Sequence, residues 1–230
     1  MIQVIFANFF YAVATICFFI VFIPQLYLNY KEKRSSGVSI HFIMMWLIAD
    51  TFSYTGALMN NLDRTFIIIT IIHCFLDLLL IYQIIFYNIL NSLRHYEDKL
   101  TSLYLPFSIL SSMTVLSYST ICFFLYFIIP YNLYMGSIFG NLTTLLFLSA
   151  RIPQFLLSYK KKTTDNLSPY LFVINMTANL SFCISLLLSS NITAAIPWII
   201  GLILSFLSDF VFIYQFYIYR HNSYVPISNI

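Results

Sequence analysis

Charged side chains are scarce in this sequence: only 8% of its 230 residues are Asp, Glu, Lys or Arg, whereas 60% are hydrophobic. Ordinary soluble domains carry about a quarter charged residues, so this composition excludes a soluble globular domain. The apolar residues lie in runs of about 20, the length that a helix needs to cross a hydrocarbon core of about 30 Å. The composition therefore indicates a membrane protein with several spans.

Cysteine is also rare, and the four cysteines lie inside apolar runs without Cys-x-x-Cys or metal-ligand spacing. This pattern implies no disulfide framework and predicts buried structural thiols. The sequence contains no nucleophile–base pair, metal cluster or phosphate loop, so we expect neither an enzyme nor a cofactor or metal. The net charge of +3 does not indicate nucleic-acid binding, because in a membrane protein the placement of basic residues among the loops carries the information.

A Pro-Gln pair occurs twice, at Pro24-Gln25 and at Pro153-Gln154, 129 residues apart and each near the end of a long apolar run. Each pair is followed at matching distances by a Tyr, two Lys and a Ser: Tyr30, Lys31, Lys33 and Ser39 in the first copy, Tyr159, Lys160, Lys162 and Ser168 in the second. A second motif, Asp-x4-Tyr-Gln-x3-Tyr, begins at Asp77 and again at Asp209. Matched identities in this register indicate an internal duplication.

The apolar runs predict seven membrane spans, at residues 5–29, 38–59, 65–88, 107–129, 137–158, 167–188 and 195–219. We expect an all-α membrane protein in which two parallel triple-helix bundles are joined by a linker helix, a 3+1+3 arrangement. The expected domains are the first bundle, a cytosolic loop with linker helix four, the second bundle and a cytosolic tail, at residues 1–90, 91–132, 133–220 and 221–230. Such repeats are typical of carriers whose site lies between the halves near the membrane midplane.

Basic residues fall almost entirely on one side of the predicted membrane. Nine of the eleven Lys and Arg residues follow spans one, three, five and seven, whereas the opposite loops hold only Arg64 and a predicted span holds Arg151. By the positive-inside rule, we expect a lumenal N-terminus and a cytosolic C-terminus. The basic loops also suit contact with anionic lipids.

Three carboxylates lie within predicted spans, at Asp50, Asp77 and Asp209, with Arg151 as the one cation among them. An ionisable group in a span costs about 2.5–3.5 kcal/mol and usually faces a cavity or a partner. The surplus of negative charge suits a cationic substrate, and protons as well, but does not suit a sugar. In the alternative reading, one Asp pairs with Arg151 and the others cap helices near an interface.

Asp50 is our candidate for binding the cationic group of a substrate. Its equivalent in the second copy is Asn179, so the duplication pairs an acid with a neutral amide. Asn175 and Asn179 share a helix face and can hydrogen-bond the α-groups of an amino acid, or serve helix packing. Trp46, one turn before Asp50, can stack on a cation or face lipid.

Asp77 and Asp209 occupy equivalent positions and are candidates for gating or proton coupling. His73 lies four residues before Asp77 on the same helix face, so the two can relay a proton; the alternative is a histidine in contact with lumenal water. Arg151 can hold a substrate carboxylate or lock an Asp in an ion pair, and we favour the lock.

Pro24 and Pro153 each remove a hydrogen bond from a helix. Because they occupy matched positions, we interpret them as the hinge of a cytosolic gate rather than as two static kinks. Gln25 and Gln154 can satisfy the freed carbonyl groups or line the transport path.

These residues resemble the PQ-loop family, and within it the lysosomal and vacuolar cationic amino-acid transporters, with cystinosin and the SWEET transporters as more distant relatives. The resemblance covers nearly the whole chain and rests on three places: residues 150–154, Trp46 with Asp50, and Pro197-Trp198 leading to Asp209. It implies seven helices, and export of Lys, Arg or His from a vacuole or lysosome to the cytosol. The Tyr224 to Ile227 segment resembles the lysosomal sorting signals of such tails.

Two other functions stay open at this stage. A carrier for cystine or another small solute would keep the fold and change the pocket. A non-transporting receptor or amino-acid sensor on the same scaffold would need a concentrated basic pocket, and only Arg151 qualifies for one.

Overall fold

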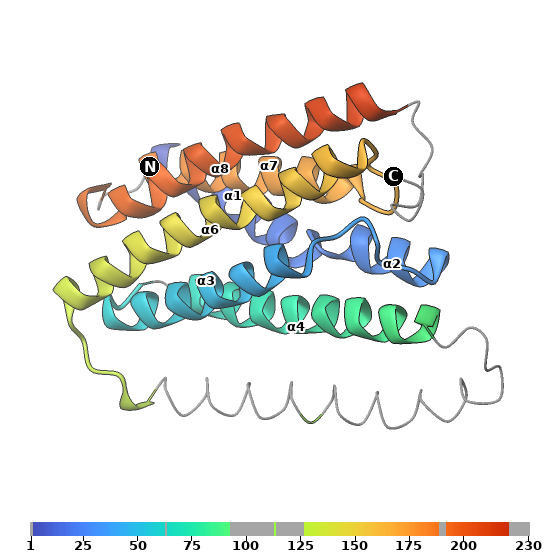
Figure 1. Ribbon diagram of the computed structural model, residues 1–230. Helices are drawn as coiled ribbons and strands as arrows, with labels where there is room; N and C mark the ends of the chain where they lie inside the picture. Colours follow the sequence, from blue (N-terminus) through green and yellow to red (C-terminus); the bar gives the residue numbers. More distant parts are fainter. Residues whose placement is uncertain (1, 63, 93–112, 114–126, 189–191, 221–230) are drawn as a thin grey trace.

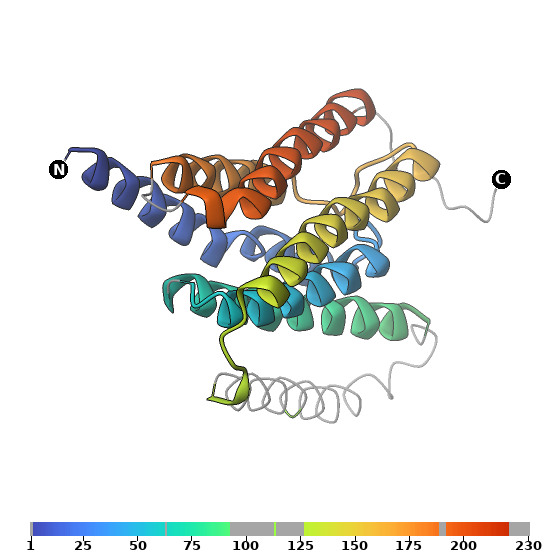
Figure 2. The same cartoon turned by 90° about the vertical axis from the view of Figure 1, so that its left-hand side faces the viewer.

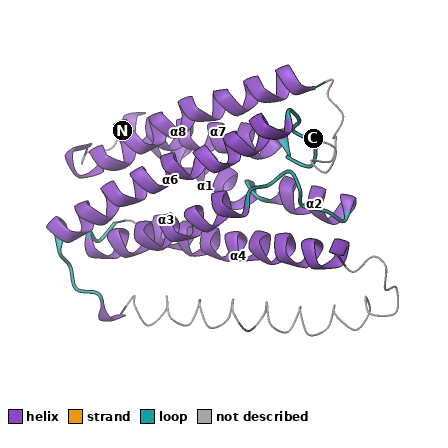
Figure 3. Cartoon of the chain, viewed as in Figure 1, coloured by secondary structure: helices purple, strands orange, loops and turns teal. Residues whose placement is uncertain are grey.

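The computed structural model describes residues 2–62, 64–92, 113, 127–188 and 192–220. All regular elements in this part of the chain are helices (Figures 1 and 3). Their bounds are Ile2–Ile20 (α1), Ile23–Glu32 (α2), Ile40–Met59 (α3), Arg64–Ser92 (α4), Leu133–Lys161 (α6), Pro169–Leu187 (α7) and Ile192–Tyr219 (α8).

Six helical segments are long and apolar enough to cross a membrane, with α1 and α2 together forming one of them. This confirms the prediction of an all-helical protein with several spans. The predicted fourth span, residues 107–129, lies almost entirely outside the described residues, so the 3+1+3 arrangement stays a prediction. The other predicted spans, except the first, match helices whose ends differ by at most a few residues.

The first predicted span is not one helix. Helix α1 ends at Ile20, and helix α2 begins at Ile23. Between them, the carbonyl oxygen of Phe22 accepts hydrogen bonds from the backbone nitrogens of Gln25 (3.1 Å) and Leu26 (2.9 Å). Pro24 explains the break, because it has no N–H to donate to the carbonyl of Ile20 four residues earlier, and its ring clashes with that carbonyl. In the second copy, by contrast, α6 continues through Pro153 without interruption.

The two copies pack against each other crosswise. The first helix of each copy contacts the second helix of the other, so that α1 packs on α7 and α6 packs on α3. The third helices pack within their own copy, α4 on α3 and α8 on α7 (Figures 1 and 2). The interface between the halves is therefore built from the first and second helices.

Polar and apolar side chains are distributed as a membrane protein requires. Large apolar side chains cover the outside, for example Ile5 on α1 (60% exposed), Leu145 on α6 (62%) and Leu207 on α8 (54%). Many polar and charged side chains are buried instead, including Asp77 and Gln154, both fully buried. The polar groups thus face the interior of the bundle, where the functional residues are found.

The two loops that follow the Pro-Gln segments, residues 33–39 and 162–168, lie at the same end of the bundle (Figure 1). We call this end, which also carries the basic residues Lys31–Arg34 and Lys160–Lys162, the basic end. The loops contact each other directly: the Arg34 side chain donates to the side-chain oxygen of Asn166 at 2.9 Å, and the Asn166 amide donates to the hydroxyl of Ser36 at 3.1 Å.

Candidate functional site

A cavity of about 90 Å³ lies between the two halves of the bundle. Helices α1, α3, α4, α6, α7 and α8 all contribute to its wall. Six of the residues predicted from the sequence line it: Trp46, Asp50, His73, Arg151, Asn175 and Asn179. The fold therefore brings together, around one cavity, side chains that are up to 133 positions apart in the chain.

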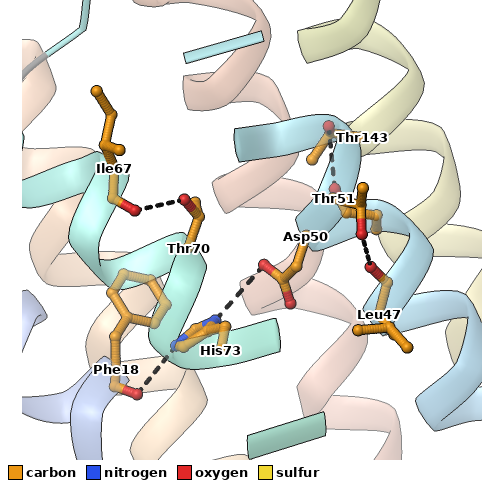
Figure 4. A network of polar contacts seen from close by, with 9 residues as sticks. Phe18, Leu47, Asp50, Thr51, Ile67, Thr70, His73 and Thr143 are labelled. Atoms are coloured by element: carbon orange, nitrogen blue, oxygen red, sulfur yellow. Dashed lines mark hydrogen bonds and ion pairs between the residues drawn. The ribbon is translucent and has the colours of Figure 1, made fainter. Parts of the chain in front are cut away.

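Asp50 lies on α3 and is 2% exposed. One of its oxygens, Oδ1, is 3.7 Å from Nδ1 of His73 on α4 (Figure 4). The other oxygen, Oδ2, has no hydrogen-bond partner among the described residues. A carboxylate oxygen in the wall of a buried cavity without a partner is expected to receive one from a ligand.

The hydrogen bonds of His73 define its tautomer. Its Nε2 lies 2.9 Å from the backbone oxygen of Phe18 on α1 (Figure 4). Because a carbonyl oxygen only accepts hydrogen bonds, Nε2 must carry a hydrogen. The other nitrogen, Nδ1, is then the one that faces Asp50, and this contact is attractive when Nδ1 also carries a proton.

Asp77, one turn further along α4, is completely buried, and neither of its oxygens has a hydrogen-bond partner in the described part of the chain. Its carboxyl group interacts with the carboxyl group of Asp50 on α3. The ion-pair contact of His73 is thus made with Asp50, whereas the sequence suggested Asp77. Helical spacing shows which residues share a face but not which neighbouring helix a side chain reaches.

Arg151 on α6 forms an ion pair with Asp209 on α8. Its Nε and Nη2 lie 3.3 and 3.2 Å from Oδ1 of Asp209, and Nη1 donates to the backbone oxygen of Phe147 at 2.8 Å. The remaining oxygen of Asp209 accepts a 2.7 Å hydrogen bond from the Asn175 amide. The sequence predicted an ion pair between Arg151 and an aspartate, and the structure contains one with Asp209, to which Asn175 is hydrogen-bonded; its role as a lock stays a prediction.

Asn179 and Trp46 also lie in the cavity wall. Asn179 is 5% exposed, and its Nδ2 has no partner among the described residues. The Trp46 ring packs on Phe22, Phe42 and Phe147. Its indole nitrogen is likewise unpartnered within the described part. Both side chains therefore have hydrogen-bond donors available to a ligand.

Trp198 on α8 is a cavity residue that the sequence analysis did not single out for binding. It is 8% exposed, lines the cavity, and has an unpartnered indole nitrogen among the described residues. The sequence signal was the Pro197-Trp198 pair, which entered only as part of the family resemblance. In an apolar span, a single tryptophan cannot be distinguished from one that faces lipid.

The glutamines of the two Pro-Gln pairs hold the opposite loops. Gln25 accepts from the backbone nitrogen of Ser168 at 2.7 Å and donates to the backbone oxygen of Asn166 at 2.9 Å. Gln154 accepts from the backbone nitrogen of Ser39 at 2.7 Å and donates to the backbone oxygen of Gly37 at 2.8 Å.

These are equivalent atoms in the two copies, and we call the two arrangements the first clasp (Gln25) and the second clasp (Gln154). The sequence analysis placed both glutamines on local carbonyl groups or on the path. In the structure, they reach across from one copy to the other instead.

The glutamine of each Tyr-Gln motif binds within its own copy. Gln83 on α4 donates to the backbone oxygen of Leu26 at 3.1 Å, and Gln215 on α8 donates to the backbone oxygen of Phe155 at 3.2 Å. Leu26 and Phe155 each lie two residues after the proline of the Pro-Gln pair in their copy. The third helix of each copy is therefore tied to the segment that carries its clasp.

The last two predicted functional residues, Tyr224 and Ile227 of the sorting pattern, lie outside the described residues. Their assignment stays a prediction.

Comparison with protein-family models gives a match to the PQ loop repeat at residues 6–66 and again at residues 135–195. The two matched segments begin 129 residues apart, which is the spacing of the two Pro-Gln pairs. The family match thus confirms the internal duplication, and together the two segments cover more than half of the chain.

Two curated relatives match nearly the full chain. A vacuolar lysine transporter of Saccharomyces cerevisiae is 25% identical, over 90% of this chain and 91% of its own length. A vacuolar histidine transporter of the same yeast is 26% identical, over 94% and 93%. Both are transporters and neither is an enzyme, in agreement with the expectation from the sequence.

Among solved structures, a eukaryotic SWEET transporter at 3.7 Å resolution matches with a TM-score of 0.52 and 15% sequence identity. The match covers 94% of this chain and 99% of the transporter chain. At this identity the similarity concerns the fold alone.

Proposed function

This chain belongs to the PQ-loop family, and on that premise we propose that it is a membrane carrier that exports cationic amino acids from a vacuole or lysosome to the cytosol. The yeast relatives support the vacuolar membrane and a basic amino acid as substrate. The observation that carries the proposal is the buried, unpartnered oxygen of Asp50, a residue that lines the cavity between the two halves.

Asp50 would bind the cationic group of the substrate. In the low dielectric of a buried cavity, a carboxylate attracts an ammonium or guanidinium group far more strongly than it does in water. The neighbouring carboxyl group of Asp77 increases the demand for positive charge, because two nearby carboxylates repel each other unless a cation or a proton lies between them. The site is therefore better suited to lysine, arginine or histidine than to a neutral solute.

Alternating access would use the two Pro-Gln segments as hinges. The helix break before Pro24 and the missing hydrogen bond at Pro153 are places where the first helix of each copy can bend. In this proposal the basic end lies on the cytosolic side and the N-terminus in the lumen, so the two clasps would close the cytosolic exit. Transport then requires the clasps to separate.

Proton coupling would reside in the cluster of His73, Asp50 and Asp77. The hydrogen bond from Nε2 leaves Nδ1 facing the Asp50 carboxyl group, so a proton relay would run between these two side chains. We expect the His73→Gln variant to retain saturable lysine uptake and to lose its dependence on pH between pH 5 and 8, the range in which histidine titrates. An unchanged pH profile would remove His73 from proton coupling.

The experiment that tests the function is uptake of radiolabelled lysine into proteoliposomes that contain the purified protein. We expect saturable uptake that arginine inhibits and that cystine and glucose do not. Uptake of cystine without lysine would make the protein a cystine carrier. Binding of lysine without any uptake would favour a receptor or sensor on the same scaffold.

A further inference from the structure

An amino-acid substrate carries a carboxylate, and the cavity has to accommodate it. The obvious partner is the guanidinium group of Arg151, which lines the cavity. Two of its nitrogens are, however, bound to Asp209 and the third donates to the backbone of Phe147. Its charge is balanced within the protein, so the substrate carboxylate needs another site.

Three residues that line the cavity have a side-chain N–H group without a partner among the described residues: Trp46 (Nε1), Trp198 (Nε1) and Asn179 (Nδ2). All three side chains are more than nine-tenths buried. Most buried donors in folded proteins have a hydrogen-bond partner, so these three N–H groups are available to a ligand that displaces water from the cavity.

The position of the Trp198 ring is fixed by its neighbour on α6. A Cβ atom added to Gly140 would lie 2.8 Å from two atoms of that ring. Glycine at this position therefore lets the ring lie directly against the backbone of α6. The indole nitrogen is thus held in place by packing before any ligand arrives, which lowers the entropic cost of using it for binding.

We propose that Trp46, Trp198 and Asn179 form an uncharged subsite that binds the α-carboxylate of the substrate, while Asp50 binds its cationic group. This inference rests on the proposed function and names the recognition at the same site. A substrate with a net charge of +1 offsets the charge of Asp50, because its carboxylate is bound by neutral donors and adds no ion pair of its own. A free Arg151 would bind the substrate carboxylate, and the cavity would then suit a zwitterionic amino acid without net charge. By pairing with Arg151, Asp209 therefore favours substrates with a net positive charge.

The subsite is tested by equilibrium binding to the purified full-length protein, with lysine and with cadaverine, which is lysine without its carboxylate. Asn179→Asp keeps the shape of the side chain and places a negative charge where the substrate carboxylate is expected. We expect lysine to bind at least 100-fold more weakly to this variant, and cadaverine to bind as tightly as before or more tightly. Trp198→Phe should weaken the binding of lysine about tenfold and leave the binding of cadaverine unchanged.

Opposite effects on the two ligands cannot come from general damage to the fold, which would weaken both. Equal losses for lysine and cadaverine in both variants would overturn the subsite, as would unchanged lysine binding in both. Absence of lysine binding to the wild-type protein would instead contradict the proposed function itself. Binding does not depend on transport, so the two failures are distinguished.

A separate observation concerns the two clasps, which differ in their support. In the first copy, Gln25 donates to the side-chain oxygen of Asn29 at 2.8 Å, and Asn29 donates to the side-chain oxygen of Gln83 at 3.1 Å. These amides form a continuous chain from the first clasp to the third helix of the copy.

In the second copy, this chain is interrupted. The residue equivalent to Asn29 is Ser158, which is buried but too short to span the same gap. Gln215, the equivalent of Gln83, is 4% exposed, and its side-chain oxygen has no partner among the described residues. The second clasp thus lacks the amide support that the first one has.

From this difference we infer that the second clasp is the weaker half of the closed gate, and that Ser158 is the residue that makes it weaker. Ser158→Asn should complete the amide chain in the second copy and favour the closed state. Asn29→Ser is the matched control, because it gives the first copy the residue of the second and should favour the open state. The inference rests on the gate described under the proposed function.

Opening of the gate is measured by pulsed electron–electron double resonance. This method gives the distribution of distances between spin labels attached at Lys31→Cys and Lys160→Cys, in a variant that lacks the four native cysteines. These two positions are exposed and equivalent at the basic end. We expect Ser158→Asn to lower the ratio of open to closed distances about threefold and Asn29→Ser to raise it. An unchanged or higher ratio in Ser158→Asn would overturn the inference. This readout is independent of substrate, so it does not depend on what the carrier transports.

Discussion

The two copies of the repeat share their fold but differ in whether their buried carboxylates have a cationic partner. In the second copy, the carboxylate of Asp209 is balanced by Arg151 and by a hydrogen bond from Asn175. In the first copy, Asp50 and Asp77 lie close together, and three of their four oxygens have no hydrogen-bond partner among the described residues. His73 lies 3.7 Å from Asp50 there, and no Lys or Arg forms an ion pair with either acid among the described residues.

This difference shows how a duplicated scaffold can divide its functions. One half carries a neutral, self-contained ion pair that holds α6 and α8 together. The other half carries negative charge that calls for a cation or a proton. The charge asymmetry, rather than the symmetric fold, would then determine which substrate the carrier accepts.

The largest effect on stability is expected from disrupting the Arg151–Asp209 ion pair of the second copy. Arg151→Leu or Asp209→Leu alone leaves one buried charge without a partner, which costs about 3–5 kcal/mol. We expect either variant to unfold at a much lower temperature than the wild type. The double variant Arg151→Leu/Asp209→Leu should recover most of the loss, because both charges are then absent. Thermal unfolding in detergent measures this, and equal losses in the single and double variants would contradict a coupled pair.

The matched prolines should respond differently to replacement. Pro153 lies inside α6, where proline is unfavourable, whereas Pro24 lies in the first turn of α2, where it is tolerated. Pro153→Ala should therefore stabilise the protein by about 1–3 kcal/mol, and Pro24→Ala should change its stability little. Both should slow uptake if the segments are hinges. Equal gains in unfolding temperature would show that the two local structures are energetically alike.

A smaller difference is expected between the two clasped loops. A Cβ atom at Gly37 would lie 2.3–2.4 Å from backbone atoms of Asp165 and Asn166. Gly37→Ala must therefore push the loops apart, at a cost of about 1–2 kcal/mol.

The equivalent residue, Asn166, has a φ of 60°, a conformation that glycine adopts freely. Asn166→Gly therefore causes no clash and removes only the side-chain hydrogen bonds to Arg34 and Ser36, worth about 0.5–1.5 kcal/mol each. Chemical denaturation in detergent measures both losses, and an unchanged stability in Gly37→Ala would contradict this account of the loops.

Much of the fold could be predicted from the sequence, because apolar runs of membrane length and repeated motifs are properties of the chain itself. The run around Pro24 shows the limit. The same Pro-Gln motif interrupts the helix in one copy and lies within a continuous helix in the other, and this depends on neighbours that the motif does not contain.

The candidate site was predictable in its residue types but not in its pairings. Asp50, Arg151 and Asn179 stand out because polar groups in spans are costly. Which acid Arg151 would bind, and that His73 would contact Asp50, depends on how α3, α4, α6 and α8 meet. The hydrogen bonds from Gln25 and Gln154 to the other copy could not be predicted either. Their partners are backbone atoms about 115–145 positions away, and every residue has such backbone groups, so the sequence does not single them out.

The central claim is that the unbalanced aspartate of the first copy binds the substrate's cation. The most direct test is the lysine dissociation constant of purified wild-type protein and of Asp50→Asn, which removes the charge and keeps the shape. We expect binding to weaken by at least 100-fold, with an unfolding temperature close to that of the wild type. Lysine binding that persists at wild-type affinity in Asp50→Asn would contradict the account.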